Sequence, residues 1–406
     1  MRVIETDCVI VGGGPAGMML GLILARNGLD VVVLEKHGDF FRDFRGDTIH
    51  PSIIGLLGEL GIREGFLDLP HTRIRTLDAV IDGNRLRPID FGRLRPPDDF
   101  LVLAPQWDFL TFLAEEGQRH DGFHLLMNTE ATDVIVESGA VRGVATSDAD
   151  DELEVRATLT VAADGRDSAV RAAAGLRPKE FGVPIDVLWF RLPKPREVPP
   201  PTLAYLDETA MVLTIDRGDY YQSGMVIKKG GLAQLQAGGI EAFREALVRT
   251  APFLRPVVDS LASWDEVKLL SVQVNRLETW HRPGLLCIGD AAHAMSPVFG
   301  VGVNYAIQDA VATANLLTPS LRAGAVAGEA LAAVQARRLP PVKRMQGIQL
   351  RVHRQLAKPG GGAILPDPMP APLRWALRAG MPLVQLLTAR MIGRGFRPEH
   401  LDPSLR

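Results

Sequence analysis

Val9-Ile-Val-Gly-Gly-Gly-Pro-Ala-Gly17 stands close to the amino terminus and predicts a turn between a strand and a helix. The apolar residues before Gly12 extend back to Cys8, as in a strand that is buried on both faces of a parallel sheet. A helix is predicted from about Pro15 to Asn27, and a second buried strand follows at 30–35. Together these segments form one βαβ unit.

The glycines of this turn have separate roles in binding a dinucleotide. Gly12 permits the tight turn, Gly14 lets a pyrophosphate approach the backbone, and Gly17 lets helix and strand pack closely. The start of the helix offers free N–H groups and the positive end of its dipole to phosphates. Glu35 ends the next strand, 18 residues after Gly17, where a carboxylate accepts hydrogen bonds from ribose hydroxyls. The pattern predicts a dinucleotide site; the alternative is a structural turn beside an unrelated surface glutamate.

Length and composition indicate a globular protein of two or three domains. The chain has 406 residues, of which 46% are hydrophobic and 23% are charged, so disordered and low-complexity classes are excluded. A net charge of −3 gives no basic field, and we expect no nucleic-acid partner. The two cysteines, Cys8 and Cys287, are too few for a disulfide framework or a zinc site, so we expect no metal and a reducing cytoplasm.

Two segments raise the question of a membrane. Residues 8–25 carry no charge over 18 positions, but their glycines and Pro15 would break a spanning helix, and acidic residues precede them. We therefore expect neither a transmembrane segment nor an export signal. Residues 371–406 contain six arginines and two acidic residues among apolar ones. A helix packed on its own domain is favoured, and weak association with a membrane surface or a partner is the alternative.

The remaining segments divide into helix-rich and strand-rich parts. Before residue 178 we expect helices at 46–70 and 107–119, a hairpin around Asp82-Gly83-Asn84 within 73–91, and strands at 123–147 and 152–163. Alternating runs between 181 and 279 predict a separate sheet with little helix before 240. A strand at 284–289, a helix at about 303–317 and helical structure from about 326, broken at 359–372, complete the chain.

Two polar motifs follow predicted strands. Asp164-Gly165, with Ser168 and Arg171 after it, by itself favours a simple turn. Gly289-Asp290 precedes His293, and Asp290 either caps the next turn or faces a ligand at the carboxyl end of the sheet. His293 is a candidate proton donor, although a structural role is the commoner one for such a histidine.

A third motif runs from Pro297 to Asp309. Gly300 and Gly302 bring bare backbone to the start of a helix. A helix start of this kind could hold the pyrimidine edge of a flavin and would stabilise negative charge on the reduced ring.

In their order and separations these motifs, which span residues 9–309, resemble those of the single-component FAD-dependent aromatic hydroxylases, the family of para-hydroxybenzoate and ubiquinone hydroxylases. The resemblance implies an α/β fold with a discontinuous Rossmann-like FAD-binding domain, a β-sheet substrate domain and a helical C-terminal segment. The expected bounds are 1–72, 105–178 and 280–325 for the FAD-binding domain, 73–104 and 179–279 for the sheet domain, and 326–406 for the C-terminal segment.

The resemblance also assigns roles to individual residues around FAD. The residues expected to bind the cofactor are Gly12, Gly14, Pro15, Ala16 and Gly17 at the pyrophosphate, Glu35 at the ribose, Arg45 on the covering loop, Gln106 and Asp290 at the ribityl chain, Asp164 near FAD and the nicotinamide, and Gly300, Gly302, Val303 and Asn304 under the pyrimidine. No catalytic base is assigned.

The substrate residues are less well defined. Pro297 and Phe299 are expected at the reacting edge of the flavin, and Tyr220 or Tyr221 in the middle sheet, where strand periodicity turns only one of them inward. Packing roles for both tyrosines are the alternative. Thr214 and Arg217 lie where the family binds a substrate carboxylate, but they are no secure match. Met18 and Met19 are expected in the core.

The resemblance implies that NAD(P)H reduces FAD and that O₂ forms a flavin hydroperoxide, which hydroxylates an aromatic or other electron-rich small molecule. One alternative with the same fold is an FAD oxidoreductase that oxidises, reduces or epoxidises a non-aromatic compound. Two alternatives from other classes are a nicotinamide-dependent dehydrogenase without flavin and a non-enzymatic redox-sensing module. The closely spaced tryptophans of flavin halogenases are absent, since Trp264 and Trp280 are 16 residues apart.

Overall fold

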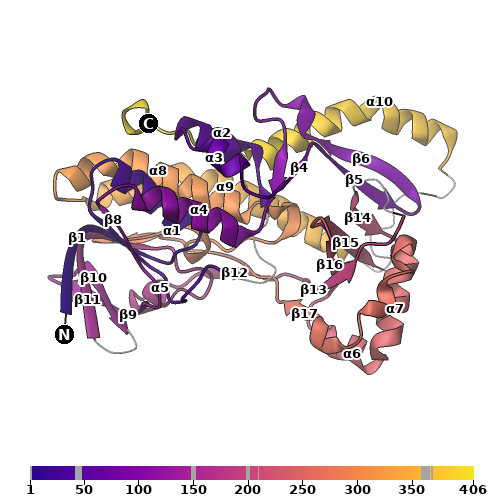
Figure 1. Ribbon diagram of the computed structural model, residues 1–406, viewed down its shortest axis with the longest axis horizontal. Coiled ribbons are helices and arrows are strands. Elements are labelled where there is room, and N and C mark those ends of the chain that lie inside the picture. The colour runs from indigo at the N-terminus through magenta and orange to yellow at the C-terminus, as the bar shows by residue number, and fades with distance from the viewer. Residues whose placement is uncertain are drawn as a thin grey trace.

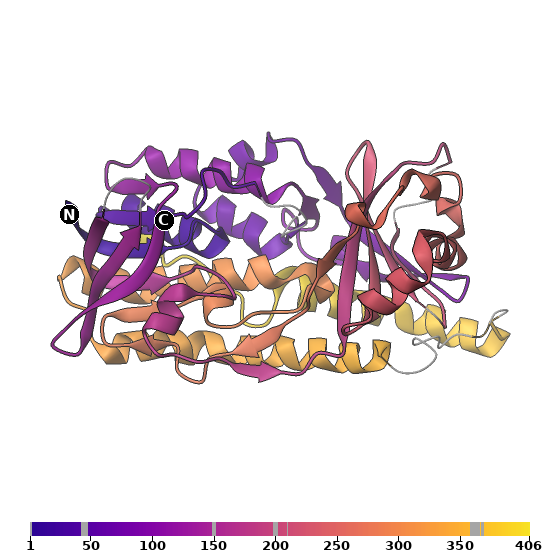
Figure 2. The same cartoon turned by 90° about the horizontal axis from the view of Figure 1, so that it is seen from below.

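The structure is a computed structural model that describes residues 2–41, 48–147, 152–197, 202–208, 210–357, 366 and 369–406. Two large sheets lie toward opposite ends of the long axis, and the helices α8 (Gly302–Arg322) and α9 (Gly328–Leu356) extend between them (Figures 1 and 2). The predicted α/β architecture is confirmed.

The first sheet contains the predicted βαβ unit. Its strands lie in the order β19-β20-β11-β1-β2-β8, and β11, β1, β2 and β8 pair in parallel, as β20 does with β11. Antiparallel strands β9 and β10 extend it from β11. The bounds are β1 Arg2–Val11, β2 Val31–Leu34, β8 Phe123–Leu126, β9 Glu130–Glu137, β10 Ala140–Ser147, β11 Glu152–Ala162, β19 His281–Arg282 and β20 Leu285–Cys287.

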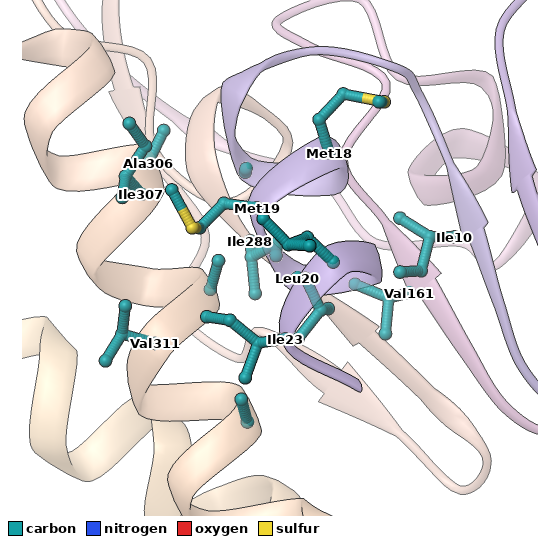
Figure 3. Packing of buried hydrophobic residues seen from close by; sticks show 14 of the residues in the cluster. Ile10, Met18, Met19, Leu20, Ile23, Val161, Ile288, Ala306, Ile307 and Val311 are labelled. Atoms are coloured by element: carbon teal, nitrogen blue, oxygen red, sulfur yellow. The ribbon is translucent and has the colours of Figure 1, made fainter. Parts of the chain in front are cut away.

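Helix α1 (Pro15–Arg26) is enclosed on several sides, which explains why its apolar residues do not form one stripe. Ten of its 12 residues are buried, including Met18 and Met19, so their prediction as core residues is confirmed. Figure 3 shows Met19 and Ile23 between the sheet and Val311 of α8. Helix α4 (Gln106–Gln118) packs against α1 as well.

The second sheet has the order β17-β13-β16-β15-β14-β5-β6. Its strands are β5 Thr76–Ile81, β6 Asn84–Asp90, β13 Ile185–Pro193, β14 Thr202–Leu206, β15 Met211–Asp216, β16 Tyr220–Lys228 and β17 Lys268–Leu270. The predicted hairpin is confirmed: Ile81 pairs with Asn84, and Asp82 and Gly83 adopt φ of 47° and 75°. Left-handed conformations at both turn positions suit the twist of a two-residue hairpin.

Each face of the second sheet has its own apolar cluster. One cluster joins Phe190 and Met225 to Phe243 of helix α7 (Gly239–Thr250). The other joins Trp189 and its neighbours to Leu350 of α9. Because consecutive strand residues point to opposite faces, the sheet is buried on both sides.

Shorter elements connect the two sheets. A three-stranded sheet has the order β3-β7-β4, so parts of 73–104 belong to it and parts to the second sheet. The remaining bounds are β3 Thr48–Ile49, β4 Thr72–Ile74, β7 Leu101–Leu103, β12 Lys179–Phe181, β18 Val274–Arg276, α2 Pro51–Glu59, α3 Arg63–Leu67, α5 Ala169–Ala173 and α6 Leu232–Ala237, together with short 3₁₀ turns at 91–93, 252–254, 258–260, 264–266, 289–291, 298–300 and 403–405. Helix α6 lies before residue 240, where little strong helix was expected; it has six residues, and none of them is buried.

Helix α10 (Ala371–Thr388), followed by a π-helical turn at 389–394, lies along β6 (Figure 1). Gln385 and Thr388 donate hydrogen bonds to the carbonyl oxygens of Arg87 and Pro88, at 3.0 and 2.6 Å. Its outer face exposes the apolar side chains of Trp375, Leu383, Val384 and Leu387. Among the described residues, no helix is both long enough and apolar enough to cross a bilayer.

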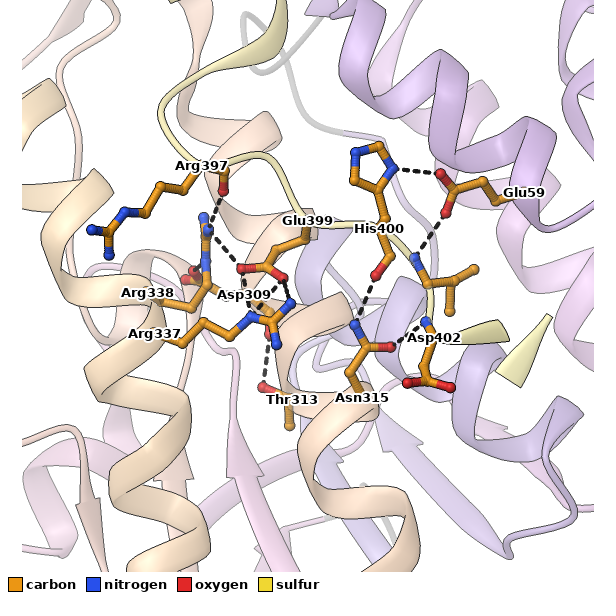
Figure 4. Close-up of polar contacts among 11 residues, drawn as sticks. Glu59, Asp309, Thr313, Asn315, Arg337, Arg338, Arg397, Glu399, His400 and Asp402 are labelled. Atoms are coloured by element: carbon orange, nitrogen blue, oxygen red, sulfur yellow. Dashed lines mark hydrogen bonds and ion pairs between the residues drawn. The ribbon is translucent and has the colours of Figure 1, made fainter. Parts of the chain in front are cut away.

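The C-terminal residues are joined to α8 and α9 by buried charges (Figure 4). Arg338 of α9 donates from Nε to Asp309 Oδ1 at 2.8 Å, and its Nη1 lies 3.3 Å from Glu399 Oε1. Arg337 also pairs with Glu399, at 2.6 Å, but its side chain is 45% exposed while that of Arg338 is 0% exposed. These buried charges join the first half of α9 and residues 397–399 to α8, whereas α10 and Leu350 of α9 contact the second sheet.

We predict that Arg338→Met destabilises the protein strongly, because it leaves the carboxylates of Asp309 and Glu399 buried without their shared cation. Loss of one partner of a buried ion pair costs about 3–5 kcal/mol. Arg337→Met is the matched control, and an exposed pair contributes about 0–1 kcal/mol. Urea denaturation of both variants measures the difference, and equal losses would contradict the assignment.

We predict that neither thiol reacts in the native protein. Cys8 and Cys287 are 0% exposed and free. Burial, with a smaller contribution from Asp7, raises the pKa of Cys8, and burial raises the pKa of Cys287 to about 12. An aromatic disulfide reagent should therefore modify both thiols in urea and neither without it. Rapid modification of the native protein would show that these strands open readily.

Candidate active site

The predicted cofactor residues meet at one edge of the first sheet. The parallel register aligns the ends of the strands: Val11 pairs with Leu34 and with Ala162, and Ala162 pairs with Cys287. Gly12, Glu35, Asp164 and Asp290 follow these strand ends by one to three residues. Ligands of open parallel sheets bind at the carboxyl ends of the strands, so these four residues lie around one predicted binding region.

The glycine loop has the geometry that was expected of a phosphate cradle. Gly12 has φ of 110°, and a β-carbon there or on Gly17 would collide with neighbouring backbone. Gly14, by contrast, has open space where a β-carbon would stand, and it precedes α1 without a side-chain cap or an acidic residue in the first turn. The first N–H groups of α1, from Ala16 after the donorless Pro15, remain available to an anion.

Glu35 is nearly buried and holds the glycine loop in place. Its Oε2 accepts a hydrogen bond from Gly13 N at 3.1 Å, and its Oε1 accepts one from His37 N at 3.0 Å. A carboxylate oxygen can accept more than one hydrogen bond, so these contacts are compatible with the predicted ribose contact. Glu35 therefore orients the glycine loop, and its contact with a ribose stays a prediction.

Arg171 connects the loop after β11 to the loop after β20. It donates from Nη1 to Ala291 O at 3.0 Å and from Nη2 to Arg166 O at 2.7 Å. Ser168 caps α5 by accepting from Arg171 N at 2.9 Å, and Asp164 accepts from Val170 N at 3.2 Å. Burial raises the pKa of Asp164. The Asp164-to-Arg171 motif is thus more than a turn, because it fixes the position of the Asp290 loop.

Asp290 lies in the 3₁₀ turn Gly289–Ala291 and does not cap it. Its side chain is 33% exposed, and its Oδ2 lies 3.6 Å from Arg166 Nη2. His293, three residues later, is buried beside the ring of Trp280 and contacts Asp309 Oδ2 at 2.5 Å. Asp290 is therefore accessible to a ligand, whereas His293 is buried and contacts Asp309, which is a structural role.

The segment before α8 has an unusual backbone. Phe299 adopts φ of 70° and Gly300 φ of 63°, and α8 then begins at Gly302 without a side-chain cap. A β-carbon on Gly302 would meet nothing within 4 Å. Asn304 is 1% exposed, and among the described residues its Nδ2 has no hydrogen-bond partner. Backbone N–H groups and an unpaired amide donor therefore converge at the start of α8, with Val303 between Gly302 and Asn304.

Thr48 of β3 and His50, just before α2, also hold this segment, and no sequence motif indicated them. Thr48 Oγ1 donates to Gly300 O at 2.9 Å, and His50 Nε2 lies 2.9 Å from the same oxygen. They follow residues 42–47, so the predicted Arg45 lies outside the described residues. Gln106, the predicted ribityl contact, is the first residue of α4 and is half-buried.

The strand register separates the two candidate tyrosines. Tyr221 is 5% exposed and packs edge-on, with ring centroids 5.9 Å apart, against Phe253, which adjoins the apolar cluster of α7. Tyr220 faces the other side, where Arg191 lies over its ring at 5.2 Å. Of the two tyrosines, Tyr220 lies on the side that faces α9, together with Ile215. Ile215 and Phe299 both pack against the core of the first sheet.

The two candidate carboxylate-binding residues, Thr214 and Arg217, also lie in different places. Thr214 pairs with Ser223 on the side of Tyr221, away from α9. Arg217 stands in the turn after β15 and donates from Nε and Nη2 to Gln222 Oε1, at 3.2 and 3.0 Å. The structure therefore does not bring Thr214 and Arg217 together as a carboxylate site.

The residues present fit FAD at its pyrophosphate and at its flavin ring. The open backbone at Gly14 suits the pyrophosphate, and the unpaired Asn304 Nδ2 at the uncapped start of α8 suits the acceptor atoms of the flavin pyrimidine. No group of three or more candidate metal ligands occurs within the described part of the chain.

Comparison with known proteins agrees with this geometry. Residues 5–347 match the family model described as FAD binding domain. The chain is 35% identical over 371 residues to 6-methylpretetramide 4-monooxygenase from Streptomyces rimosus, covering 88% of this chain and 85% of that protein.

Similar solved structures show the same fold. PqsL, a probable FAD-dependent monooxygenase from Pseudomonas aeruginosa, superposes with a TM-score of 0.76 at 22% identity, covering 88% of this chain and 98% of that one. OxyS anhydrotetracycline hydroxylase from Streptomyces rimosus superposes with a TM-score of 0.74 at 21% identity, covering 96% and 76%. The chain belongs to the FAD binding domain family, and it is an FAD-dependent monooxygenase that uses NAD(P)H.

Proposed function

We propose that the enzyme hydroxylates an aromatic small molecule held between Pro297–Phe299 and the α9-facing side of the second sheet. The observation that carries the proposal is the uncapped start of α8 with the unpaired donor of Asn304, immediately after this segment. Pro297 and Phe299 come directly before these groups in the chain, so they would line the reacting edge of a flavin held there. The sheet supplies the opposite wall of the site.

The sheet side offers both apolar surface and one polar contact. The indole of Trp189 lies against Gly224, where a β-carbon would approach its ring to 3.0 Å. Its Nε1 is buried and has no hydrogen-bond partner among the described residues. An unpaired buried donor costs about 1–3 kcal/mol, so a substrate oxygen that accepts this hydrogen bond gains affinity. A phenolic ring combines the apolar body and the acceptor that this wall requires, and Tyr220 and Phe299 are its aromatic neighbours.

FAD, when bound, supplies the redox chemistry: it accepts a hydride from NAD(P)H and activates O₂ for transfer of one oxygen atom to the ring. The chain's residues hold the reactants. The loop Gly12–Gly17 binds pyrophosphate, Glu35 and Asp290 accept hydrogen bonds from ribose and ribityl hydroxyls, and the start of α8 stabilises negative charge near the pyrimidine. The packed second sheet keeps water from the reacting edge. No side chain of the protein needs to act as a nucleophile.

Several expectations remain part of the proposal. We assign FAD binding to 1–72, 105–178 and 280–325 and substrate binding to 73–104 and 179–279, with β3, β4 and β7 as the connection between them. We place the enzyme in a reducing cytoplasm because its two thiols are free. Weak association of residues 371–406 with a membrane surface stays a prediction, and the exposed apolar residues of α10 are compatible with it.

The names of the relatives support hydroxylation over the alternative of the same fold. One is called a 4-monooxygenase and one a hydroxylase, and neither name describes an oxidation or reduction without oxygen transfer. 6-Methylpretetramide, the compound in the name of the first relative, is therefore the first substrate to test.

We predict that a substrate stimulates NAD(P)H consumption and that its product gains one oxygen atom from ¹⁸O₂. A panel of phenolic and polycyclic aromatic compounds, screened by NAD(P)H absorbance and then by mass spectrometry, measures both. Incorporation from H₂¹⁸O instead, or turnover without added oxygen, would favour the oxidoreductase alternative.

We predict that Asp290→Ala weakens FAD binding by about tenfold or more, because it removes a charge-assisted hydrogen bond of about 1.5–3 kcal/mol. The variant should stay folded, since Asp290 is partly exposed and lies outside the core. Asp259→Ala, at a side chain that is 89% exposed, is the control and should keep its FAD. Titration of the apoproteins with FAD compares them, and unchanged affinity of Asp290→Ala removes that residue from the site.

A further inference from the structure

The segment Ser296–Gly300 holds a conformation that its own sequence does not favour. Phe299 has φ of 70° and ψ of −3°, in the left-handed region that bulky residues rarely adopt. Such a residue is strained by about 1–3 kcal/mol and persists only where surrounding contacts determine its backbone. Pro297 to Gly300 are only half-buried, so their backbone depends on a small number of specific contacts.

Thr48 and His50 hold this segment at Gly300 O, and Gln349 of α9 holds it at Ser296 and Val298. Its Nε2 donates to Ser296 O at 3.1 Å and to Val298 O at 3.0 Å, and its Oε1 accepts from Ser296 N at 3.3 Å. The side chain is 0% exposed. One amide thus satisfies three backbone groups, in the way that a neighbouring strand would satisfy them.

His353, four residues later on α9, completes the arrangement. Its Nε2 lies 2.6 Å from Ser296 Oγ, and that oxygen also accepts from Val298 N at 3.1 Å. Ser296 Oγ and His353 Nε2 therefore share one hydrogen bond, whose direction follows the tautomer of the neutral ring. Burial lowers the pKa of His353 to about 4, in agreement with this geometry. Nδ1 has no partner among the described residues, so the ring forms a hydrogen bond there with Ser296 only.

Gln346, one turn earlier on α9, makes comparable bonds at a different place. Its Nε2 donates to Asn275 O at 2.8 Å and to Ala294 O at 2.9 Å, and it is 1% exposed. Gln346 and Gln349 thus have the same chemistry and burial, but only Gln349 and His353 reach residues 296–298. This difference separates a general packing role of α9 from a specific role toward Phe299.

We propose that Gln349 and His353 are positioning residues that fix Ser296–Val298, and through them the left-handed Phe299 and the start of α8, against the flavin and the substrate. The inference rests on the proposed function for the identity of the ligands. Neither residue touches the reacting atoms in this proposal. They act through the backbone, from a helix that lies beyond the sequence motifs of the family resemblance.

Gln349→Met and Gln346→Met test this with matched losses of buried hydrogen bonds at nearly constant volume. Both should lower the urea midpoint by similar amounts. Only Gln349→Met should change the visible circular dichroism of bound flavin, weaken FAD binding on the order of tenfold, and lower the product formed per NAD(P)H by a similar factor, since small misplacements near the reacting atoms have large effects. Equal flavin spectra, FAD affinity and coupling in the two variants would overturn the proposal.

His353 provides an independent pair of variants if Gln349→Met does not fold. His353→Gln retains a polar group that can reach Ser296 Oγ and should keep the wild-type flavin spectrum, whereas His353→Leu should reproduce the expected Gln349→Met spectrum. Identical spectra of wild-type, Gln and Leu proteins would overturn the role of His353. The spectra and FAD affinities need no substrate. A wild-type protein that binds FAD but hydroxylates nothing would therefore contradict the proposed function while leaving the positioning test intact.

Discussion

The carboxylate of Asp309 is the point at which three separate parts of the chain are joined. It accepts hydrogen bonds from Gly289 N at 3.1 Å, from His293 and from Arg338. Burial by itself would raise its pKa, but His293 and Arg338 outweigh burial, and the pKa of Asp309 lies below its usual value. An ionised carboxylate inside the core is tolerated only with such partners. The loop after β20, helix α8 and helix α9 consequently cannot move independently.

This junction explains how a site assembled from distant residues stays in one arrangement. The loop that carries Asp290 is bonded to Asp309 through Gly289, and to α5 through Arg171. Helix α9 is bonded to Asp309 through Arg338, and the same helix holds Ser296 and Val298 through Gln349. The loop at the proposed ribityl contact and the segment at the proposed pyrimidine contact are therefore both fixed to the same buried charge cluster around Asp309.

The second sheet contributes differently, because it meets the first through side-chain packing. Trp189 and its neighbours pack against Leu350 on the side toward α9, while Phe190 and Phe243, with ring centroids 5.5 Å apart, close the other side. Side chains alternate along each strand, so each residue of this sheet points either toward α9 or toward α7. The wall toward α9 combines apolar surface with the unpaired indole N–H of Trp189.

Local sequence determined the parts of this protein that depend on neighbours in the chain. The glycines at 12, 14 and 17, the apolar strand before them and Glu35 after the next strand were sufficient for the βαβ unit, because turn geometry and parallel pairing follow from short-range sterics. The hairpin at Asp82-Gly83 was predictable for the same reason. The α/β fold class and the use of FAD followed from the order of such motifs.

Tertiary structure alone decided the contacts between residues far apart in sequence. Whether Tyr220 or Tyr221 faces α9 depends on register, since a shift of one residue exchanges them. Thr48 and His50 reach Gly300 across about 250 positions, and Gln349 and His353 reach Ser296 from a segment for which only helical structure was predicted. A buried glutamine or histidine has the same appearance in sequence whether it bonds to a loop, to a ligand or to its own helix, and only the fold shows which partner lies within hydrogen-bond distance.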